Sequence, residues 1–120
     1  MVGKKSSSIN EQKLLLFSKL RKEVQDDRIL DAMMGVPREN FIPTDILDKA
    51  YDDVALPIGH DQTISQPLMV AIMVSALMVG RSDNVLEIGT GSGYLTAILS
   101  RLANNVDSLD RVPELLSAAS

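Results

Sequence analysis

The chain has 120 residues, of which 45% are hydrophobic but only 3% aromatic, and its formal net charge at pH 7 is −4. This length favours a single domain, and an acidic chain without a cluster of lysines and arginines argues against a protein that binds nucleic acid. The sequence contains no cysteine and a single histidine, which argues against a disulfide framework and against a metal site. Because it also contains no signal-peptide core and no long apolar run, we expect a cytoplasmic protein that does not enter a membrane.

The N-terminal part of the sequence predicts a tail followed by two helices. Residues 1–8 are rich in lysine and serine, so we expect a mobile tail. Ser8 and Glu11 match the S-x-x-E capping box that begins a helix. Four apolar residues then fall on one face of that helix: Leu16, Phe17, Leu20 and Val24. Asp27 is placed to cap a second, short helix that ends at Gly35.

The middle of the chain is less regular. Two prolines in residues 36–43 predict an extended connector, and the apolar spacing in residues 46–51 predicts one or two helical turns. Residues 52–66 show no period of either kind, and an irregular segment of this length inside a domain is often functional. Residues 68–79 are apolar almost all round, which predicts a helix that is buried on both sides, under a sheet.

A glycine-rich stretch follows. Residues 85–88 predict a buried strand, and a helix is expected to begin near Ser92, with a second parallel strand at 106–110. Without Cβ atoms, Gly89 and Gly91 can adopt positive φ angles and leave bare backbone beside a ligand, and the unpaired N–H groups at the helix start suit an anionic group. We therefore predict an α/β fold in which an N-terminal helical segment is followed by the start of a doubly wound, Rossmann-like sheet.

The spacing of the glycines favours one class of ligand. Tyr94 occupies the position of the third glycine of the dinucleotide fingerprint, and the Gly-Lys-Ser/Thr ending of a phosphate loop is absent. What remains is G-x-G-x-G with Glu87 two residues before the first glycine, which resembles motif I of S-adenosylmethionine-dependent methyltransferases. Asp110 follows Gly89 by 21 residues, where such folds place an acid that binds ribose. The alternatives are a glycine turn that binds nothing, and an Asp110 that caps a helix begun by residues 112–114.

Several stretches together resemble the protein-L-isoaspartate O-methyltransferase family. They are residues 36–43, 50–51, 56–67, 85–94 and 109–115, so that the resemblance runs from about Glu11 to the last residue. The most specific part is Gly59-His60 followed by Gln-Thr-Ile-Ser-Gln-Pro at 62–67. The resemblance implies methyl transfer from S-adenosylmethionine to the carboxylate of L-isoaspartyl residues in damaged proteins. That reaction needs no metal and no strong base, because a carboxylate is already ionised at neutral pH.

The resemblance also implies roles for individual residues. Ser65 is the expected catalytic residue, and Thr63, Ile64 and His60 would line the substrate pocket. The cofactor would be held by Glu87, Gly89, Thr90, Gly91 and Asp110. From local sequence Ser65 is equally an N-cap for the next helix, and His60 could be purely structural. A serine nucleophile is not expected, since nothing in the sequence indicates a base for it.

Asp61 departs from the family, which commonly has glycine there. An acid at this position would repel an anionic substrate unless it points to solvent.

The resemblance implies a seven-stranded sheet, whereas this sequence predicts only two of its parallel strands. We therefore expect a truncated chain with impaired activity, which could self-associate through open sheet edges. We expect one domain, with a helical and substrate-loop region at 9–80 and the first βαβα portion of the cofactor-binding region at 81–120. Two alternatives stay open: another S-adenosylmethionine-dependent methyltransferase, acting on a small molecule or RNA, and a non-catalytic remnant or interaction module.

Overall fold

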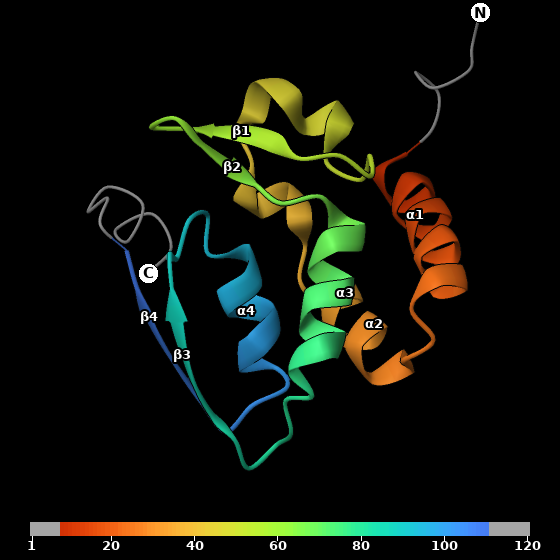
Figure 1. Cartoon of the computed structure of the whole chain (residues 1–120). Helices are drawn as coiled ribbons and strands as arrows, with labels where there is room; N and C mark the ends of the chain where they lie inside the picture. Colours follow the sequence, from red (N-terminus) through yellow and green to blue (C-terminus); the bar gives the residue numbers. More distant parts are fainter. Residues whose placement is uncertain (1–7, 111–120) are drawn as a thin grey trace, which may run out of the picture.

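The computed structural model describes residues 8–110, and it contains helices, a short hairpin and a two-stranded parallel sheet (Figure 1). Residues 1–7 of the tail predicted at 1–8, and the predicted helix after Arg111, lie outside the described residues, whereas Ser8 is described. The elements in chain order are α1 (Ile9–Glu23), α2 (Asp27–Met34), the 3₁₀ helices η2 (Arg38–Phe41) and η3 (Thr44–Lys49), β1 (Leu56–Gly59), β2 (Gln62–Ile64), α3 (Pro67–Leu77), β3 (Asn84–Ile88), α4 (Tyr94–Ser100) and β4 (Asn105–Leu109).

The first two helices begin at side-chain caps. The Ser8 hydroxyl accepts the Glu11 N–H at 3.1 Å, and the Glu11 carboxylate accepts the Ser8 N–H, which confirms the capping box. The expectation that Asp27 caps α2 is wrong by one residue. Asp26 has the extended backbone of a cap, and its Oδ1 accepts the N–H groups of Arg28 and Ile29, so Asp27 becomes the first helical residue.

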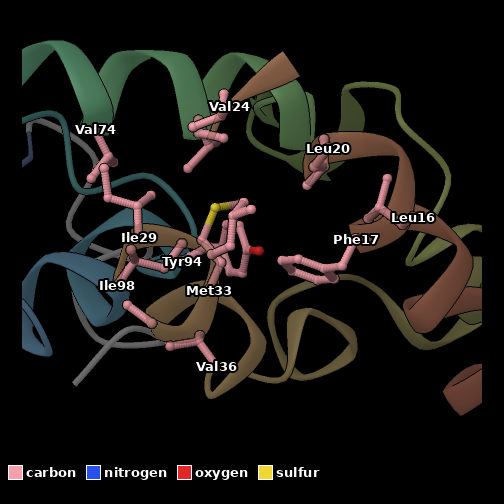
Figure 2. Packing of buried hydrophobic residues seen from close by; sticks show 14 of the residues in the cluster. Leu16, Phe17, Leu20, Val24, Ile29, Met33, Val36, Val74, Tyr94 and Ile98 are labelled. Atoms are coloured by element: carbon pink, nitrogen blue, oxygen red, sulfur yellow. The ribbon is translucent and has the colours of Figure 1, made fainter. Parts of the chain in front are cut away.

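One apolar core joins the N-terminal helices to α4. The predicted stripe of α1 is buried, and Ile29, Leu30 and Met33 of α2 pack beside it. Figure 2 shows Tyr94 and Ile98 of α4 pointing into this cluster. The element that carries the glycine-rich loop is thereby anchored to the helices at the other end of the sequence.

Helix α3 differs from its prediction. It buries Val70, Ala71 and Val74 against α1 and α2, but Met69, Ile72, Met73 and Leu77 remain exposed, and α4 rather than α3 covers the sheet (Figure 1). A helix that is apolar all round indicates burial without specifying which element packs against it, and within residues 8–110 no element covers one face of α3. No helix in residues 8–110 is both long and apolar enough to cross a membrane.

Two segments expected to lack regular structure contain some. Within the extended connector, η2 forms where Asn40 N–H donates to Pro37 O at 3.0 Å, a bond that fits between two prolines because it needs only one turn. Within residues 52–66, β1 and β2 pair antiparallel, with Leu56 opposite Ile64. Each strand is too short to show an alternating pattern, so pairing rather than periodicity defines the hairpin.

The parallel pair forms as predicted, but the expectation of a buried strand at 85–88 is wrong for one face, where Leu86 and Ile88 are exposed. Strands β3 and β4 run in register from Asn84 opposite Asn105 to Ile88 opposite Leu109, so that β4 begins one residue before its predicted start. Their carboxyl ends meet at the glycine-rich loop.

Candidate active site

The glycine-rich loop needs glycine at each alternate position. Gly89, Gly91 and Gly93 have φ angles of +90°, +57° and +89°, a region that side-chain-bearing residues rarely adopt. A Cβ built on Gly89 or Gly91 would meet no atom within 4 Å, so both face open space. The prediction of positive φ at Gly89 and Gly91 is therefore confirmed.

Three N–H groups ahead of α4 that could have met an anionic group bond within the protein instead. Helix α4 begins at Tyr94 rather than near Ser92. The loop N–H groups are already bonded: Gly89 and Thr90 donate to Leu109 O at 2.6 and 3.1 Å, and Gly91 donates to Asp110 Oδ2 at 2.7 Å. These bonds close the loop onto the end of β4, so a ligand here meets glycine Cα surface more than free donors.

A buried polar cluster lies beneath the loop. Glu87 is 7% exposed, and its Oε1 accepts hydrogen bonds from Ser108 Oγ at 2.6 Å and from Thr96 Oγ1. Ser108 Oγ also lies 2.6 Å from Thr90 Oγ1. The family resemblance implied Glu87 and Thr90 as site residues, but sequence reasoning missed Ser108 and Thr96. Ser108 could have been found, because it precedes Asp110 by two residues and so shares its strand face.

Two adjoining cavities bring the predicted residues together. A small one of about 90 Å³ has Thr63, Ile64 and Ser65 on one side, and Glu87 with residues 89–92 on the other. A larger one of about 420 Å³ is lined by Gln62, Thr63, the strand ends Ile88 and Leu109, and Asp110. Thr63, Gly89 and Gly91 line both. The hairpin segment and the glycine-rich loop therefore face each other across one hollow.

His60 and Asp61 line neither of these cavities. Both are exposed at the hairpin turn, with φ angles of +55° and +56°. The structure thus separates His60 from the other predicted substrate-pocket residues, and it leaves Asp61 exposed outside both cavities.

Ser65 is not the N-cap of α3, so that alternative is wrong. Gln66 occupies the cap position, with no side-chain cap bond. The Leu68 N–H is accepted instead by Asp53 Oδ1 at 2.9 Å, from a residue that sequence reasoning did not consider. A cap supplied from 15 residues away leaves no local signal.

A buried cation lies beside two tyrosines, one of which, Tyr94, lines the small cavity. Arg38 is fully buried, and its guanidinium carbon lies 5.0 Å from the centre of the Tyr94 ring. Burial lowers the pKa of Arg38 and raises the pKa of the Tyr94 hydroxyl. Burial, with a hydrogen bond to Glu39, also raises the pKa of the Tyr51 hydroxyl. The sequence marked Arg38 only as part of a resembling stretch and assigned it no role.

Comparison with known proteins decides the family. Residues 10–120 match the model of the family Protein-L-isoaspartate(D-aspartate) O-methyltransferase. The chain belongs to this family. A protein-L-isoaspartate O-methyltransferase from Dictyoglomus turgidum is 51% identical over 96 residues, covering 80% of this chain and 44% of the relative. A protein-L-isoaspartate O-methyltransferase from Roseiflexus castenholzii is 46% identical over 110 residues, which cover 92% of this chain and 50% of that relative.

Solved structures agree with this family assignment. A Plasmodium falciparum structure described as a protein-L-isoaspartate O-methyltransferase, in complex with S-adenosyl-L-homocysteine, superposes with a TM-score of 0.79 at 27% identity. The superposed region covers 89% of this chain and 52% of the P. falciparum chain. The predicted α/β methyltransferase fold is thereby confirmed. This chain spans about half the length of the curated relatives it matches.

Proposed function

We propose that the protein transfers the methyl group of S-adenosylmethionine to the carboxylate of L-isoaspartyl residues in damaged proteins. The observation that carries the proposal is the small cavity in which the Thr63–Ser65 segment faces the glycine-rich loop. The names of the relatives and the S-adenosyl-L-homocysteine in the P. falciparum structure support both the reaction and the cofactor.

The residues present fit the cofactor. Gly89 and Gly91 expose bare backbone to open space, and the adjoining cavity of about 420 Å³ ends at Asp110. The Asp110 carboxylate accepts the Gly91 N–H and lines this cavity, and a carboxylate is an acceptor suited to ribose hydroxyls. Glu87 and Thr90 would support the loop from beneath through Ser108. When bound, S-adenosylmethionine supplies a methyl group activated by a sulfonium.

The chain's own residues need mainly to position the acceptor. We assign to Ser65 a hydrogen bond from its hydroxyl to the isoaspartyl carboxylate, and to Thr63 and Ile64 the wall beside it. The acceptor carboxylate is ionised at neutral pH, so no base is required. Holding the carboxylate in line with the methyl group and excluding water are then the principal contributions to the rate. His60, at the exposed turn, has no part in this assignment.

Titration calorimetry and a methyl-transfer assay test the proposal. The 120-residue chain is titrated with S-adenosyl-L-homocysteine, and transfer is assayed on an isoaspartyl peptide against the matched aspartyl peptide. We expect binding heat with S-adenosyl-L-homocysteine, and methyl transfer to the isoaspartyl peptide but not to the aspartyl peptide. The transfer should be slow, because this chain spans only about half the length of its relatives. No binding heat would favour a non-catalytic module, and transfer only to an unrelated acceptor would favour another methyltransferase.

A further inference from the structure

Arg38 bonds to three backbone carbonyls, two between η3 and β1 and one just after β2. Its Nε donates to Ala50 O at 2.8 Å, and its Nη2 donates to Val54 O at 3.3 Å and to Ser65 O at 3.0 Å. The side chain is fully buried, and these bonds offset part of the cost of burying a guanidinium, while Nη1 makes no hydrogen bond within residues 8–110. These carbonyls therefore hold Arg38 in place, and Arg38 in turn holds the backbone of Ser65.

Asp53 holds the same turn from its other end. Its side chain is 7% exposed, and Oδ1 accepts the Leu68 N–H at 2.9 Å while Oδ2 lies 3.6 Å from Lys19 Nζ. Two charged side chains thus bind the backbone on either side of Gln66 and Pro67, where no local side chain caps the helix. The direction in which Ser65 leaves β2 depends on both of them.

Arg38 also reaches the opposite wall of the small cavity. Its guanidinium lies over the ring of Tyr94, the first residue of α4, which directly follows the glycine-rich loop. Figure 2 shows Tyr94 inside the common core, so this contact joins the Ser65 turn to a fixed element. One side chain thereby sets the separation between the predicted acceptor side and the predicted cofactor side.

We propose that Arg38 and Asp53 are positioning residues that hold Ser65 at a set distance from the glycine-rich loop. The proposal rests on the proposed function, since it takes Ser65 as the residue that meets the isoaspartyl carboxylate. Neither residue touches the reacting atoms. Each acts on Ser65 through the backbone, so the loss of either should affect the acceptor more than the cofactor.

The main test compares Asp53→Ala with Asp53→Asn in the 120-residue chain. The alanine variant removes the acceptor of the Leu68 N–H, whereas the asparagine Oδ1 can accept the same bond without the charge. The measurement is hydrogen exchange at the Leu68 amide. In Asp53→Ala we expect this amide to exchange at least about tenfold faster than in the wild type, because a charge-assisted hydrogen bond is lost. In Asp53→Asn the exchange rate should stay close to that of the wild type. Asp48→Ala, which removes an exposed carboxylate from the preceding segment, is the matched control.

Binding provides the second readout. With S-adenosyl-L-homocysteine present, the dissociation constant of a labelled isoaspartyl peptide is expected to rise about tenfold in Asp53→Ala, because a misplaced contact group is costly. The dissociation constant of S-adenosyl-L-homocysteine itself should stay within about twofold, as for a distant independent site. Arg38→Lys should weaken peptide binding as Asp53→Ala does, and leave S-adenosyl-L-homocysteine binding unchanged, since a lysine ammonium cannot reach all three carbonyls. Arg38→Met leaves those carbonyls unpaired and can fail to fold, so it is not relied on.

The outcomes separate the two proposals. If the wild type binds no isoaspartyl peptide, the proposed function fails, and hydrogen exchange alone still decides whether Asp53 holds the turn. Unchanged exchange at Leu68 in Asp53→Ala would overturn the positioning role. So would equal losses of peptide and S-adenosyl-L-homocysteine affinity, because they would indicate general destabilisation. Faster exchange with selective loss of peptide affinity, restored in Asp53→Asn, would support it.

Discussion

Ser65 is held by its backbone rather than by its side chain. Its carbonyl accepts a hydrogen bond from Arg38, whereas its hydroxyl makes none within residues 8–110 and is exposed toward the small cavity. A hydroxyl without a structural partner, on a backbone that is fixed, is suited to bind a ligand. This arrangement separates the contribution of Ser65 to stability from its proposed contribution to the reaction.

Ser65→Ala should therefore leave the fold almost unchanged. We expect the free energy of unfolding to change by less than about 0.5 kcal/mol, as for a surface position. Ser8→Ala removes a true N-cap and should cost about 1 kcal/mol. Urea denaturation of both variants measures the difference. A cost for Ser65→Ala equal to that for Ser8→Ala would restore the capping interpretation.

Tyr51 makes stability depend on pH in the alkaline range. Its hydroxyl accepts a hydrogen bond from the backbone N–H of Arg38 at 3.1 Å and donates one to the Glu39 carboxylate, and burial raises the pKa of the hydroxyl. Because the folded pKa lies above the unfolded value of about 10, the unfolded chain loses this proton first as pH rises. The stabilisation is complete below pH of about 10 and is lost above it.

Tyr51→Phe should weaken that dependence. The variant is less stable at neutral pH by about 1–2 kcal/mol, since Glu39 and the Arg38 N–H lose a partner. Between pH of about 10 and 11 its free energy of unfolding should fall less steeply than that of the wild type. Urea denaturation at a series of pH values tests this, and parallel curves for the two proteins would refute it.

At the scale of elements, the hairpin carries two side chains in left-handed backbone. His60 and Asp61 both have φ near +55°, which is the geometry of the tight turn that joins β1 to β2. Aspartate tolerates this conformation better than most residues, although glycine fits it without strain. Asp61, where the family commonly has glycine, is therefore a turn residue exposed to solvent rather than a charge in the proposed substrate pocket.

Asp61→Gly should stabilise the protein. We expect a gain of up to about 1 kcal/mol from relief of the left-handed strain, partly offset by the greater freedom of glycine in the unfolded chain. Asp61→Val is the opposite control, because a branched side chain is poorly accommodated at positive φ. Thermal denaturation of both variants should move the midpoint in opposite directions. A shift in the same direction would mean that the turn is not strained.

The glycine-rich loop allows a similar separation of stability from binding. Gly91→Ala places a Cβ in open space, so its cost in stability should be only the strain of about 1 kcal/mol. The same Cβ faces the proposed cofactor site, and we expect S-adenosyl-L-homocysteine to bind at least about tenfold more weakly, a difference of about 1.4 kcal/mol. Calorimetry measures this. Gly80→Ala, whose Cβ would meet Asp83 at an ordinary 3.6 Å, should leave binding unchanged.

At the scale of the whole molecule, residues 8–110 cover the parallel sheet on one face only. Val85, Glu87 and Ser108 face α4, while Leu86, Ile88 and Leu109 on the other face are 62%, 74% and 56% exposed. Strand β3 pairs with β4 alone among the described residues. An apolar face beside an open strand edge favours association.

We expect the 120-residue chain to self-associate through this face. Light scattering across a range of protein concentrations should show a mass that rises with concentration, and Ile88→Lys should return it to that of a monomer. Met78→Lys, at an equally apolar and exposed position at the end of α3, should not. A monomer at all concentrations would refute the expectation.

Structural features that depend only on residues close together in the sequence could be predicted. The capping box at Ser8, the stripe of α1, the glycine conformations and the strands around them depend on neighbours within about one turn or one pleat. The specific block at 59–67 indicated the family, which the comparisons confirm. The domain limits, the cytoplasmic location and the roles of Ser65 and Asp110 remain predictions.

Only the tertiary structure decided how the site is held together. Local pattern treated residues 52–66 as irregular, whereas pairing across a turn makes them a hairpin. Arg38 bonds to Ser65 27 residues away, Asp53 caps α3 from 15 residues away, and Ser108 reaches Glu87 from 21 residues away. Such contacts form only after the chain has closed large loops around a common core, so no short stretch of sequence records them. The sequence by itself determined the glycine-rich loop and the family, and folding decided which side chains position Ser65 beside that loop.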